Sequence, residues 1–365
     1  MCKGLDVYLF LTGMMLLSEV ARREGLFDWL SAFAARRSGG SAKRLFLLVY
    51  GVGVIVTTFL SNDATAVVLT PAVVAVTRAA RAENPLAYLF ICAFIANAAS
   101  FVLPISNPAN LVLYASKTPA LLTWLEHFAL PAILSIVVTY VILRWTQREA
   151  LTLTISDDIN QSPLSAGGRT AAIGIAMTAI ILLVASTLGL QLGLPTAIAG
   201  GLTTTIVLVI KREAPWPVLS GISWAVLPLV AGLFVLVQGL GHTGVITQLG
   251  DLLRRSVATN APGTAWMAGI ALAIMSNLMN NLPAGLVAAN TILQSHPPVV
   301  VASALLVGVD LGPNLSITGS LATILWLTAL RRENLEVSFL QFLKIGALVM
   351  PSALLVALAS MILSR

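Results

Sequence analysis

The sequence has little charge for its length. Only 10% of its 365 residues are charged, whereas 58% are hydrophobic. A soluble globular domain carries about 25% charged residues, so this composition excludes an ordinary soluble protein. Apolar segments of about 20 residues, each long enough to cross a bilayer, recur about ten times along the chain. The sequence therefore predicts an all-α polytopic membrane protein.

Residues that bind metals or form disulfides are also scarce. The two cysteines, Cys2 and Cys92, are too few for a disulfide framework or a multi-thiolate metal site. The three histidines, His127, His242 and His296, lie far apart in the sequence. The chain has no Walker-type Gly-Lys-Ser/Thr loop, so we expect no nucleotide hydrolysis, no metal and no bound cofactor. We attribute the net charge of +6 to basic loops that orient a membrane protein, and not to nucleic-acid binding.

Polar residues interrupt the apolar run from Leu45 to Thr77. The interruption reads Ser61-Asn62-Asp63-Ala64-Thr65. An ionisable group is costly inside a membrane, so it indicates a functional site. Basic residues flank both ends of the run, at Arg44 and Arg78, and the positive-inside rule then places both ends in the cytoplasm. We therefore predict a re-entrant hairpin with this polar stretch at its tip.

Three further apolar runs are interrupted in a similar way. The second hairpin consists of Thr264 to Met279 and Pro283 to Leu293, separated by Asn280 and Asn281; the two broken spans are Leu86 to Ser116, interrupted at Leu103 to Asn110, and Val299 to Leu330, interrupted at Asp310 to Ser320. Irregular backbone at membrane depth is tolerated only where it is buried in protein or lines a cavity. These interruptions therefore predict where the interior of a transporter lies.

The same order of features occurs twice along the chain: a span, an interfacial helix, a hairpin, a broken span and a final span. We predict two inverted repeats, residues 1–145 and 170–365, joined by a cytoplasmic linker of residues 146–169. Each repeat would contain a re-entrant helical hairpin and a broken transmembrane helix. The second repeat has additional spans before the common pattern. We therefore expect the first repeat to lack roughly two N-terminal spans, or about 50 residues.

The side chains at the interruptions form the candidate substrate site. Transporters with inverted repeats and broken helices bind substrate near the midplane, where half-helix ends offer unpaired N–H groups. The candidate substrate ligands are Ser61, Asn62, Thr65, Ser106, Asn107, Asn110, Asn280, Asn281, Asn314, Thr318 and Ser320. The alternative is that these groups cap half-helices or join neighbouring helices.

Asp63 and Asp310 are the candidates for proton coupling. They are the ionisable residues nearest the expected midplane, and no Lys or Arg lies at a similar depth in the sequence. A buried carboxylate without a cationic partner favours its protonated form, which a proton-coupled carrier can use. For Asp310 the alternative is capping of the half-helix after Gly312-Pro313. We expect Glu19 to reach the cytoplasmic membrane surface. The lack of cations argues against a carboxylate substrate held by salt bridges, but not against one held by helix ends and bound cations.

Several of these motifs resemble the membrane subunits of arsenite efflux pumps. The matching stretches are Ser61 to Pro71, Pro104 to Asn110, Met279 to Pro283 and Asp310 to Thr323. That family belongs to an ion-transporter superfamily that also includes sodium-coupled dicarboxylate and citrate carriers and sodium/proton antiporters. The resemblance implies export of arsenite or antimonite across the inner membrane. It also implies either exchange with protons or cooperation with a soluble ATPase subunit.

Three functions remain open at this point. Arsenite is mostly the uncharged trihydroxide at neutral pH, and a pocket of amides and hydroxyls without thiolates suits it. One alternative is a sodium-coupled di- or tricarboxylate carrier or a sodium/proton antiporter, although carboxylate carriers tend to have Ser-Asn-Thr at both hairpin tips. Another is a membrane docking subunit for a soluble ATPase. The expected partners are arsenite or antimonite, protons, lipid, the ATPase subunit and a second copy of the chain in a homodimer, but no nucleic acid.

Overall fold

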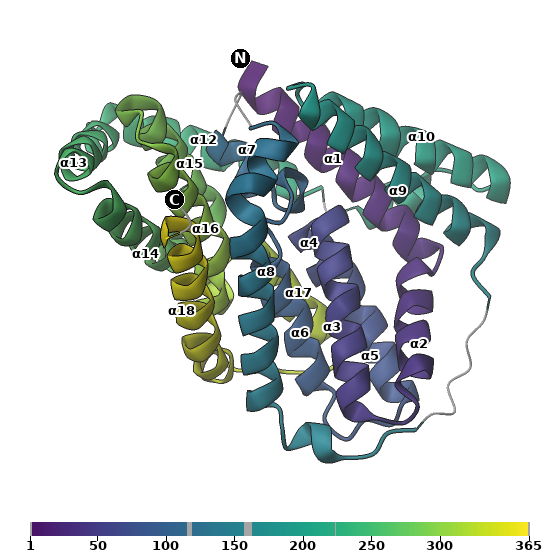
Figure 1. Cartoon of the computed structure of the whole chain (residues 1–365). Helices are drawn as coiled ribbons and strands as arrows, with labels where there is room; N and C mark the ends of the chain where they lie inside the picture. Colours follow the sequence, from purple (N-terminus) through teal and green to yellow (C-terminus); the bar gives the residue numbers. More distant parts are fainter. Residues whose placement is uncertain (1, 115–118, 157–162, 223, 364–365) are drawn as a thin grey trace.

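The computed structural model describes residues 2–114, 119–156, 163–222 and 224–363 (Figure 1). The first-half helices are α1 Cys2–Arg23, α2 Leu26–Ser38, α3 Ala42–Phe59, α4 Asn62–Ala64, α5 Thr70–Ala79, α6 Leu86–Ala98, α7 Pro108–Tyr114 and α8 Leu121–Thr146. The second-half helices are α9 Ala166–Thr187, α10 Gly193–Lys211, α11 Trp216–Gly221, α12 Val226–His242, α13 Val245–Thr259, α14 Ala261–Met279, α15 Asn281–Ser295, α16 Val299–Leu311, α17 Leu321–Arg332 and α18 Phe339–Leu363. The prediction of an all-α membrane protein is confirmed. Of the predicted linker, residues 157–162 lie outside the described part, as does the end of the first broken span at Ser116.

Five of the described helices, α3, α8, α9, α10 and α18, are each long and apolar enough to cross a membrane alone. A sixth span results if α12 and α13, which meet at a 73° bend, are counted together. The sequence suggested about ten apolar segments of spanning length. Fewer helices have that length because the broken spans divide into shorter pieces, such as α6 and α16 of 13 residues each.

The first hairpin forms where it was predicted. Helix α3 ends at Phe59, and the backbone of Ser61 is fully extended, with φ 172° and ψ 167°. The chain then returns through α4, a π-helical turn of Thr65–Leu69, and α5. Pro71 explains the wide turn, because a proline within a continuous α-helix lacks one hydrogen bond and clashes with the preceding turn. Figure 1 shows α4 at the upper end of α3, and α5 packs on α2 and α6.

Both broken spans are interrupted at the predicted prolines and glycines. Helix α6 ends at Ala98, and α7 begins with Pro108, where the missing N–H is not needed. Helix α16 ends at Leu311, and Gly312-Pro313 starts a short 3₁₀ turn before α17. Each break therefore leaves the C-terminus of one half-helix and the N-terminus of another inside the protein.

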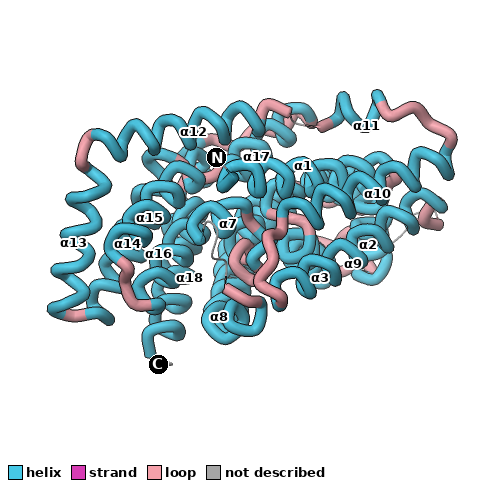
Figure 2. The backbone as a smooth tube through the Cα atoms, turned by 90° about the horizontal axis from the view of Figure 1, so that it is seen from above, coloured by secondary structure: helices cyan, strands magenta, loops and turns pink. Residues whose placement is uncertain are grey.

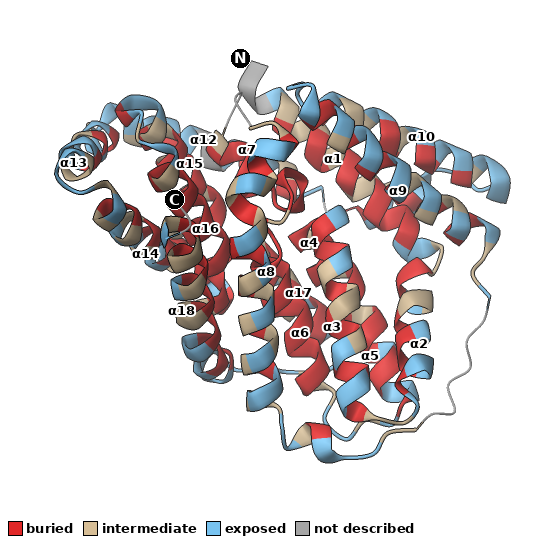
Figure 3. Cartoon of the chain, viewed as in Figure 1, coloured by how far each residue is buried: buried red, intermediate tan, exposed pale blue. Residues whose placement is uncertain are grey.

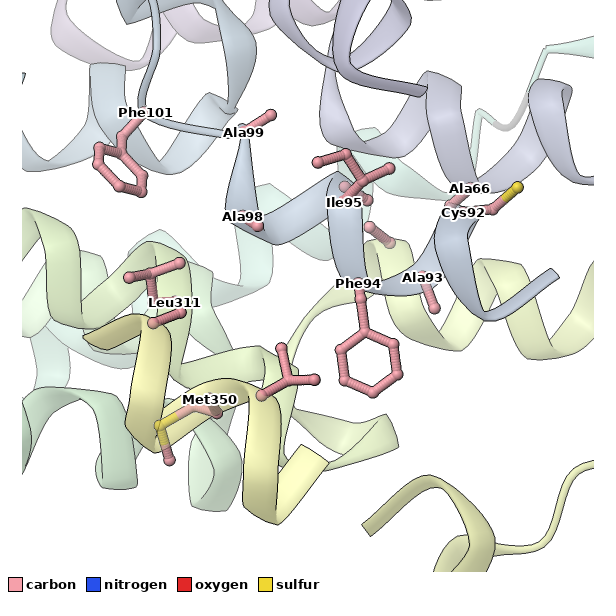
Figure 4. Close-up of a cluster of buried hydrophobic side chains, with 14 of the residues drawn as sticks. Ala66, Cys92, Ala93, Phe94, Ile95, Ala98, Ala99, Phe101, Leu311 and Met350 are labelled. Atoms are coloured by element: carbon pink, nitrogen blue, oxygen red, sulfur yellow. The ribbon is translucent and has the colours of Figure 1, made fainter. Parts of the chain in front are cut away.

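Helix α6 lies at the centre of the molecule and is almost entirely buried (Figure 3). A helix that is apolar all round packs on every side. Phe94 stacks on Phe342 of α18 at 4.8 Å between ring centroids, and the indole of Trp326 in α17 donates to the Leu89 carbonyl over 2.9 Å. Figure 4 shows Ala98 and Leu311 within this core, where α6 packs on α16.

The two halves of the chain interlock rather than pack as separate bodies. The first hairpin packs on α17 from the second half, whereas α15 of the second hairpin packs on α7 from the first half. Seen from above, α12 and α11 cross one edge of the bundle (Figure 2). This interlocking brings the interruptions of both halves into one interior region. The inverted relation of the two repeats stays a prediction.

Helices α1, α9 and α10 form a second group beside this interior (Figure 1). Glycines allow the close approach, because a Cβ atom on Gly200 would lie 2.5 Å from the Gly13 carbonyl oxygen. Apolar side chains on the outer face of α9, such as Ile173 and Ile180, are more than half exposed. Such exposed apolar faces suit contact with lipid. The face of α1 that points away from α9 and α10 is free to line the interior.

Candidate transport site

An open cavity lies between α1, the tip of the first hairpin and the start of α12, with about 620 Å³ of empty space when the part open to the outside is included. Its polar lining residues are Ser18, Glu19, Ser61 and Asp63. The remaining lining is apolar and includes Met14 and Met15 of α1, Pro108 at the start of α7 and Leu325 of α17. The cavity therefore places one predicted hairpin tip beside the first span and both broken helices.

Asp63 lies at the hairpin tip and faces this cavity. The Ala64 N–H donates to the Ser61 hydroxyl oxygen over 3.2 Å, and the Asp63 N–H donates to Asn62 Oδ1 over 2.9 Å. These bonds fix the backbone of the tip. Among the described residues, no Lys, Arg or His forms an ion pair with the Asp63 carboxylate. The tip thus holds a carboxylate without a cationic partner at a cavity wall.

Glu19 is the second acidic group of the cavity. It was expected to reach the membrane surface, but it is only 5% exposed and lines the cavity. Arg22, one turn later in α1, holds its carboxylate through contacts of 2.6 and 2.8 Å. A Cβ atom on Gly221 would overlap the Glu19 carboxylate, so this glycine allows α11 to close over it. Glu19 differs from Asp63 in having a cation beside it.

Four predicted substrate ligands cap the half-helices that follow the interruptions. Ser61 caps α4 and Asn107 accepts from the Ala109 N–H at 3.0 Å in α7. Asn280 accepts from the Leu282 N–H at 3.4 Å in α15, and Ser320 accepts from the Thr323 N–H at 3.1 Å in α17. A side-chain cap occupies one of the free N–H groups at each helix start. The capping alternative therefore describes the main contacts of these residues.

The two broken helices are joined by pairs of buried side chains. The Asn107 amide donates to Asp310 Oδ1 over 2.7 Å, across 203 positions of sequence. The Asn97 amide donates to Asn314 Oδ1 over 3.0 Å, and the Asn314 amide donates to the Phe94 carbonyl over 3.0 Å. All of these side chains are at most 1% exposed. Asp310 is therefore held at the contact between the halves and does not line the cavity.

The other predicted ligands are largely occupied by protein contacts. Thr65 bonds to Thr57 at 2.8 Å, Ser106 donates to the Thr58 carbonyl at 2.9 Å, and Asn110 donates to the Ser100 carbonyl at 2.8 Å. Thr318 donates to the Asn277 carbonyl at 3.1 Å. Asn62 and Asn281 are buried at their hairpin tips. Within the described part of the chain, Ser61 and Asp63 are the predicted residues that line the cavity.

Sequence reasoning missed two asparagines that organise this region. Asn97 is a single polar residue in the apolar run of α6, and that isolation was a usable signal. Asn277 donates to the Ala273 and Gly312 carbonyls at 2.8 and 2.9 Å and accepts from Ser316 at 2.8 Å. It thereby ties α14 to the second helix break. The described residues contain no group of three or more His, Cys, Asp or Glu side chains suited to a metal.

Comparisons with known proteins agree on the class of the chain. The arsenical pump membrane protein of Yersinia enterocolitica is 28% identical over 364 residues, covering 96% of this chain and 84% of the relative. That of Escherichia coli K12 is 28% identical over 362 residues, with the same coverage. An uncharacterized transporter of Mycobacterium tuberculosis is 26% identical over 375 residues, covering 98% of this chain and 85% of the relative.

A solved structure supports the fold. The YdaH transporter of Alcanivorax borkumensis, whose topology is described as unusual, superposes with a TM-score of 0.62 at 19% identity. The match covers 97% of this chain and 84% of that one. The sequence model of the citrate transporter family, CitMHS, matches residues 4–309 of this chain. This match spans most of the sequence, so the chain belongs to the citrate transporter (CitMHS) family and is a multi-pass membrane transporter.

Proposed function

We propose that this secondary transporter exports arsenite or antimonite across the inner membrane in exchange for protons. The observation that carries the proposal is the cavity between α1 and the first hairpin, where Asp63 and Ser61 meet Ser18 and Glu19. The arsenical pump membrane proteins that resemble this chain along most of its length support the same substrate. Of the residues predicted to bind substrate, Ser61 keeps that role here, and we propose that those that cap half-helices position the hairpin tips and helix breaks instead.

The lining of the cavity suits a neutral, oxygen-rich molecule. Serine hydroxyls can donate and accept, and a carboxylate accepts hydrogen bonds from hydroxyl groups of the substrate. Met14 and Met15 add polarizable thioethers, which contact a soft metalloid without the covalent capture expected of a thiolate. The thiol of Cys92 cannot contact a molecule in the cavity, because Cys92 is 0% exposed and does not line it.

Proton exchange is proposed for Asp63. Its carboxylate reaches the cavity and has no ion-pair partner among the described residues, so protonation and substrate binding can compete at one place. Asp310 was proposed as a second coupling residue. Its contact with Asn107 and its complete burial favour a role away from the substrate.

Citrate is the second candidate substrate, and the family match favours it. The electrostatics of the cavity oppose direct binding of a tricarboxylate. The lining described by the structure contains two carboxylates and no Lys, Arg or His. Arg22 offsets the charge of Glu19, but Asp63 has no cationic partner among the described residues and would repel a carboxylate in a cavity of low dielectric. A citrate carrier built on this cavity would need bound cations to offset that repulsion. A soluble ATPase partner and a homodimer are further proposals that rest on the resemblance alone.

Arsenite export is testable in cells that lack their own arsenite efflux system. We expect cells that express the chain to retain less arsenic after arsenite exposure than cells with an empty vector. Growth in arsenite should improve in parallel. A Gly221→Leu variant tests the cavity itself. Its leucine side chain would enter the cavity beside Glu19, so we expect this variant to give no reduction in arsenic retention. Equal arsenic retention with and without the chain, at confirmed membrane expression, would contradict the proposal.

A further inference from the structure

A second pocket, called the basic pocket below, lies between the start of α3, the end of α8 and the short 3₁₀ turn of Ala150–Thr152. Its empty space is about 680 Å³ when the part open to the outside is included. The charged residues in its lining are Lys43, Arg144, Arg148 and Glu149. Three cations and one carboxylate leave the lining with a net positive charge, so the pocket attracts anions.

The three cations of the basic pocket have no acidic partner in the described part of the chain. None of them forms an ion pair with a described carboxylate, that of Glu149 included. The Arg144 guanidinium donates to the Tyr140 hydroxyl over 3.3 Å, and the Arg148 guanidinium lies 5.5 Å from the centre of the Trp145 ring. Neither contact occupies more than one of the five guanidinium N–H groups. Each arginine can therefore bind a phosphate group through two parallel hydrogen bonds.

Hydrogen bonds and core packing hold the walls of the basic pocket in place. Helices α3 and α8 are joined where the Tyr50 hydroxyl donates to the Ile136 carbonyl over 2.6 Å. The chain after the 3₁₀ turn is tied to the start of α3, because the Ile155 N–H donates to the Gly40 carbonyl over 3.3 Å. Leu151 is 3% exposed and anchors the turn in the hydrophobic core. Packed elements therefore form the pocket, rather than one exposed loop.

The basic pocket lies at the ends of two helices that are long and apolar enough to cross a membrane. Helix α3 begins at Ala42 and α8 ends at Thr146, and Figure 1 shows these two ends on the same side of the molecule. Trp145 is 56% exposed, and tryptophan is enriched where a membrane meets water. The basic residues at these ends indicate the cytoplasmic surface. The pocket is therefore at the level of the lipid headgroups.

Exposed apolar side chains continue from the basic pocket along both helices. On α3, Leu47 is 51% exposed and lies one turn beyond Lys43. On α8, Val141 is 56% exposed and lies about one turn before Arg144. Residues three or four positions apart share one face of a helix. A molecule with an anionic head in the pocket can therefore lay hydrocarbon tails on these apolar faces.

We propose that the basic pocket binds the phosphate headgroup of an anionic phospholipid. Basic pockets between transmembrane helices on the cytoplasmic side suit cardiolipin and related headgroups. Arg144 and Arg148 bind the phosphate oxygens in pairs, and Lys43 adds a point charge from the start of α3. The apolar faces beside the pocket favour a lipid over free phosphate or an acidic segment of a soluble protein. The site is separate from the cavity beside Asp63 and does not depend on arsenite as the substrate.

The test is thermal unfolding of the purified full chain in a neutral detergent, with increasing amounts of cardiolipin or of phosphatidylcholine. A ligand that binds only the folded state raises its stability with concentration. We expect cardiolipin to raise the melting temperature in a saturable way and phosphatidylcholine to leave it unchanged. Arg144→Gln combined with Arg148→Gln should raise the half-saturating cardiolipin concentration about tenfold. A melting temperature that does not respond to cardiolipin in the wild type would overturn the proposal.

The matched control is Arg331→Gln combined with Arg332→Gln. These exposed arginines lie in the last turn of α17, another basic helix end, so the substitutions remove the same charge outside the basic pocket. The response to cardiolipin should stay at the wild-type value. An equal loss of response in both double variants would overturn the site, because the lipid would then respond only to the net charge of the protein.

Native mass spectrometry of the wild-type chain keeps the proposal testable if the variants do not fold. Retention of cardiolipin in the presence of excess phosphatidylcholine supports the site. Displacement of cardiolipin by inorganic phosphate at equal concentration would show a site for free anions and would overturn it. Displacement by polyglutamate at equal concentration would show a docking surface for an acidic protein segment and would overturn it as well.

Discussion

Replacing Asp63 by asparagine is expected to abolish proton-driven arsenite uptake by everted membrane vesicles. Asparagine has the same shape and can still hydrogen-bond substrate, but it cannot take up and release a proton. Asp63 lies at the cavity wall without an ion-pair partner among the described residues, so no neighbouring charge would substitute for it. Uptake of labelled arsenite with an acidic vesicle interior measures the effect.

The matched control for Asp63→Asn is Asp251→Asn. Asp251 lies in α13, is partly exposed, and pairs with Arg254 one turn later in the same helix. Its substitution should leave uptake within the scatter of the wild type. Wild-type rates in Asp63→Asn vesicles would show that this carboxylate is not the coupling group. Facilitated, gradient-independent arsenite exchange in the variant would support loss of coupling with retained substrate binding.

Replacing Asn107 by leucine is expected to have the largest effect on stability. The change removes the amide that donates to Asp310 Oδ1 and leaves that oxygen unpaired in a fully buried position. Removal of a hydrogen bond to a buried charged group costs about 1.5–3 kcal/mol, well above the cost of a surface substitution. The fraction of folded protein after heating, followed by size-exclusion chromatography in detergent, measures the loss.

A double variant separates the unpaired charge from simple misfit. Asn107→Leu combined with Asp310→Leu replaces the polar pair by two apolar side chains, and such replacements are often nearly neutral. We therefore expect the double variant to recover the stability lost with the Asp310 contact, but not the part lost with the cap on α7. Asn290→Leu is the control, since Asn290 is half-buried and bonds within its own helix to the Leu286 carbonyl. A double variant that is less stable than Asn107→Leu would contradict this account of the Asn107–Asp310 contact.

The sequence was sufficient to predict the interruptions, because their causes are local. Pro71, Pro108 and Gly312-Pro313 prevent regular α-helix wherever they occur, and the surrounding runs are too apolar to lie outside a membrane. The hairpin and the broken helices accordingly form at the predicted residues. The pairing of the two arms of each hairpin was predictable for the same reason, because a short interruption joins them in the chain.

The partners of the polar residues were not predictable, because they are remote. Asn107 meets Asp310 across 203 positions, and Asn97 meets Asn314 across 217. A sequence shows that such residues must be buried, but not which others they contact. Capping and substrate binding also use the same residue types, since both need short side chains with oxygen acceptors. Ser61 and Ser320 therefore looked alike in sequence, although only Ser61 of the two lines the cavity described here.

Glu19 shows how geometry changes the interpretation of a membrane-edge residue. Its place two residues before Ala21 and three before Arg22 suggested a side chain that extends to the surface. The structure turns it inward, because Gly221 leaves room for α11 to pack over it and Arg22 offsets its charge. Neither Gly221 nor the packing of α11 on α1 is apparent from the first span alone.

We propose that a neutral metalloid, and not citrate, moves through this transporter in exchange for protons. The most direct test is parallel uptake of labelled arsenite and labelled citrate into proteoliposomes of the purified chain, with an acidic interior or a sodium gradient imposed. We predict that arsenite accumulates with the acidic interior, that a protonophore abolishes the accumulation, and that citrate does not accumulate. Citrate accumulation driven by either gradient, without arsenite flux, would contradict proton-coupled arsenite transport by this chain.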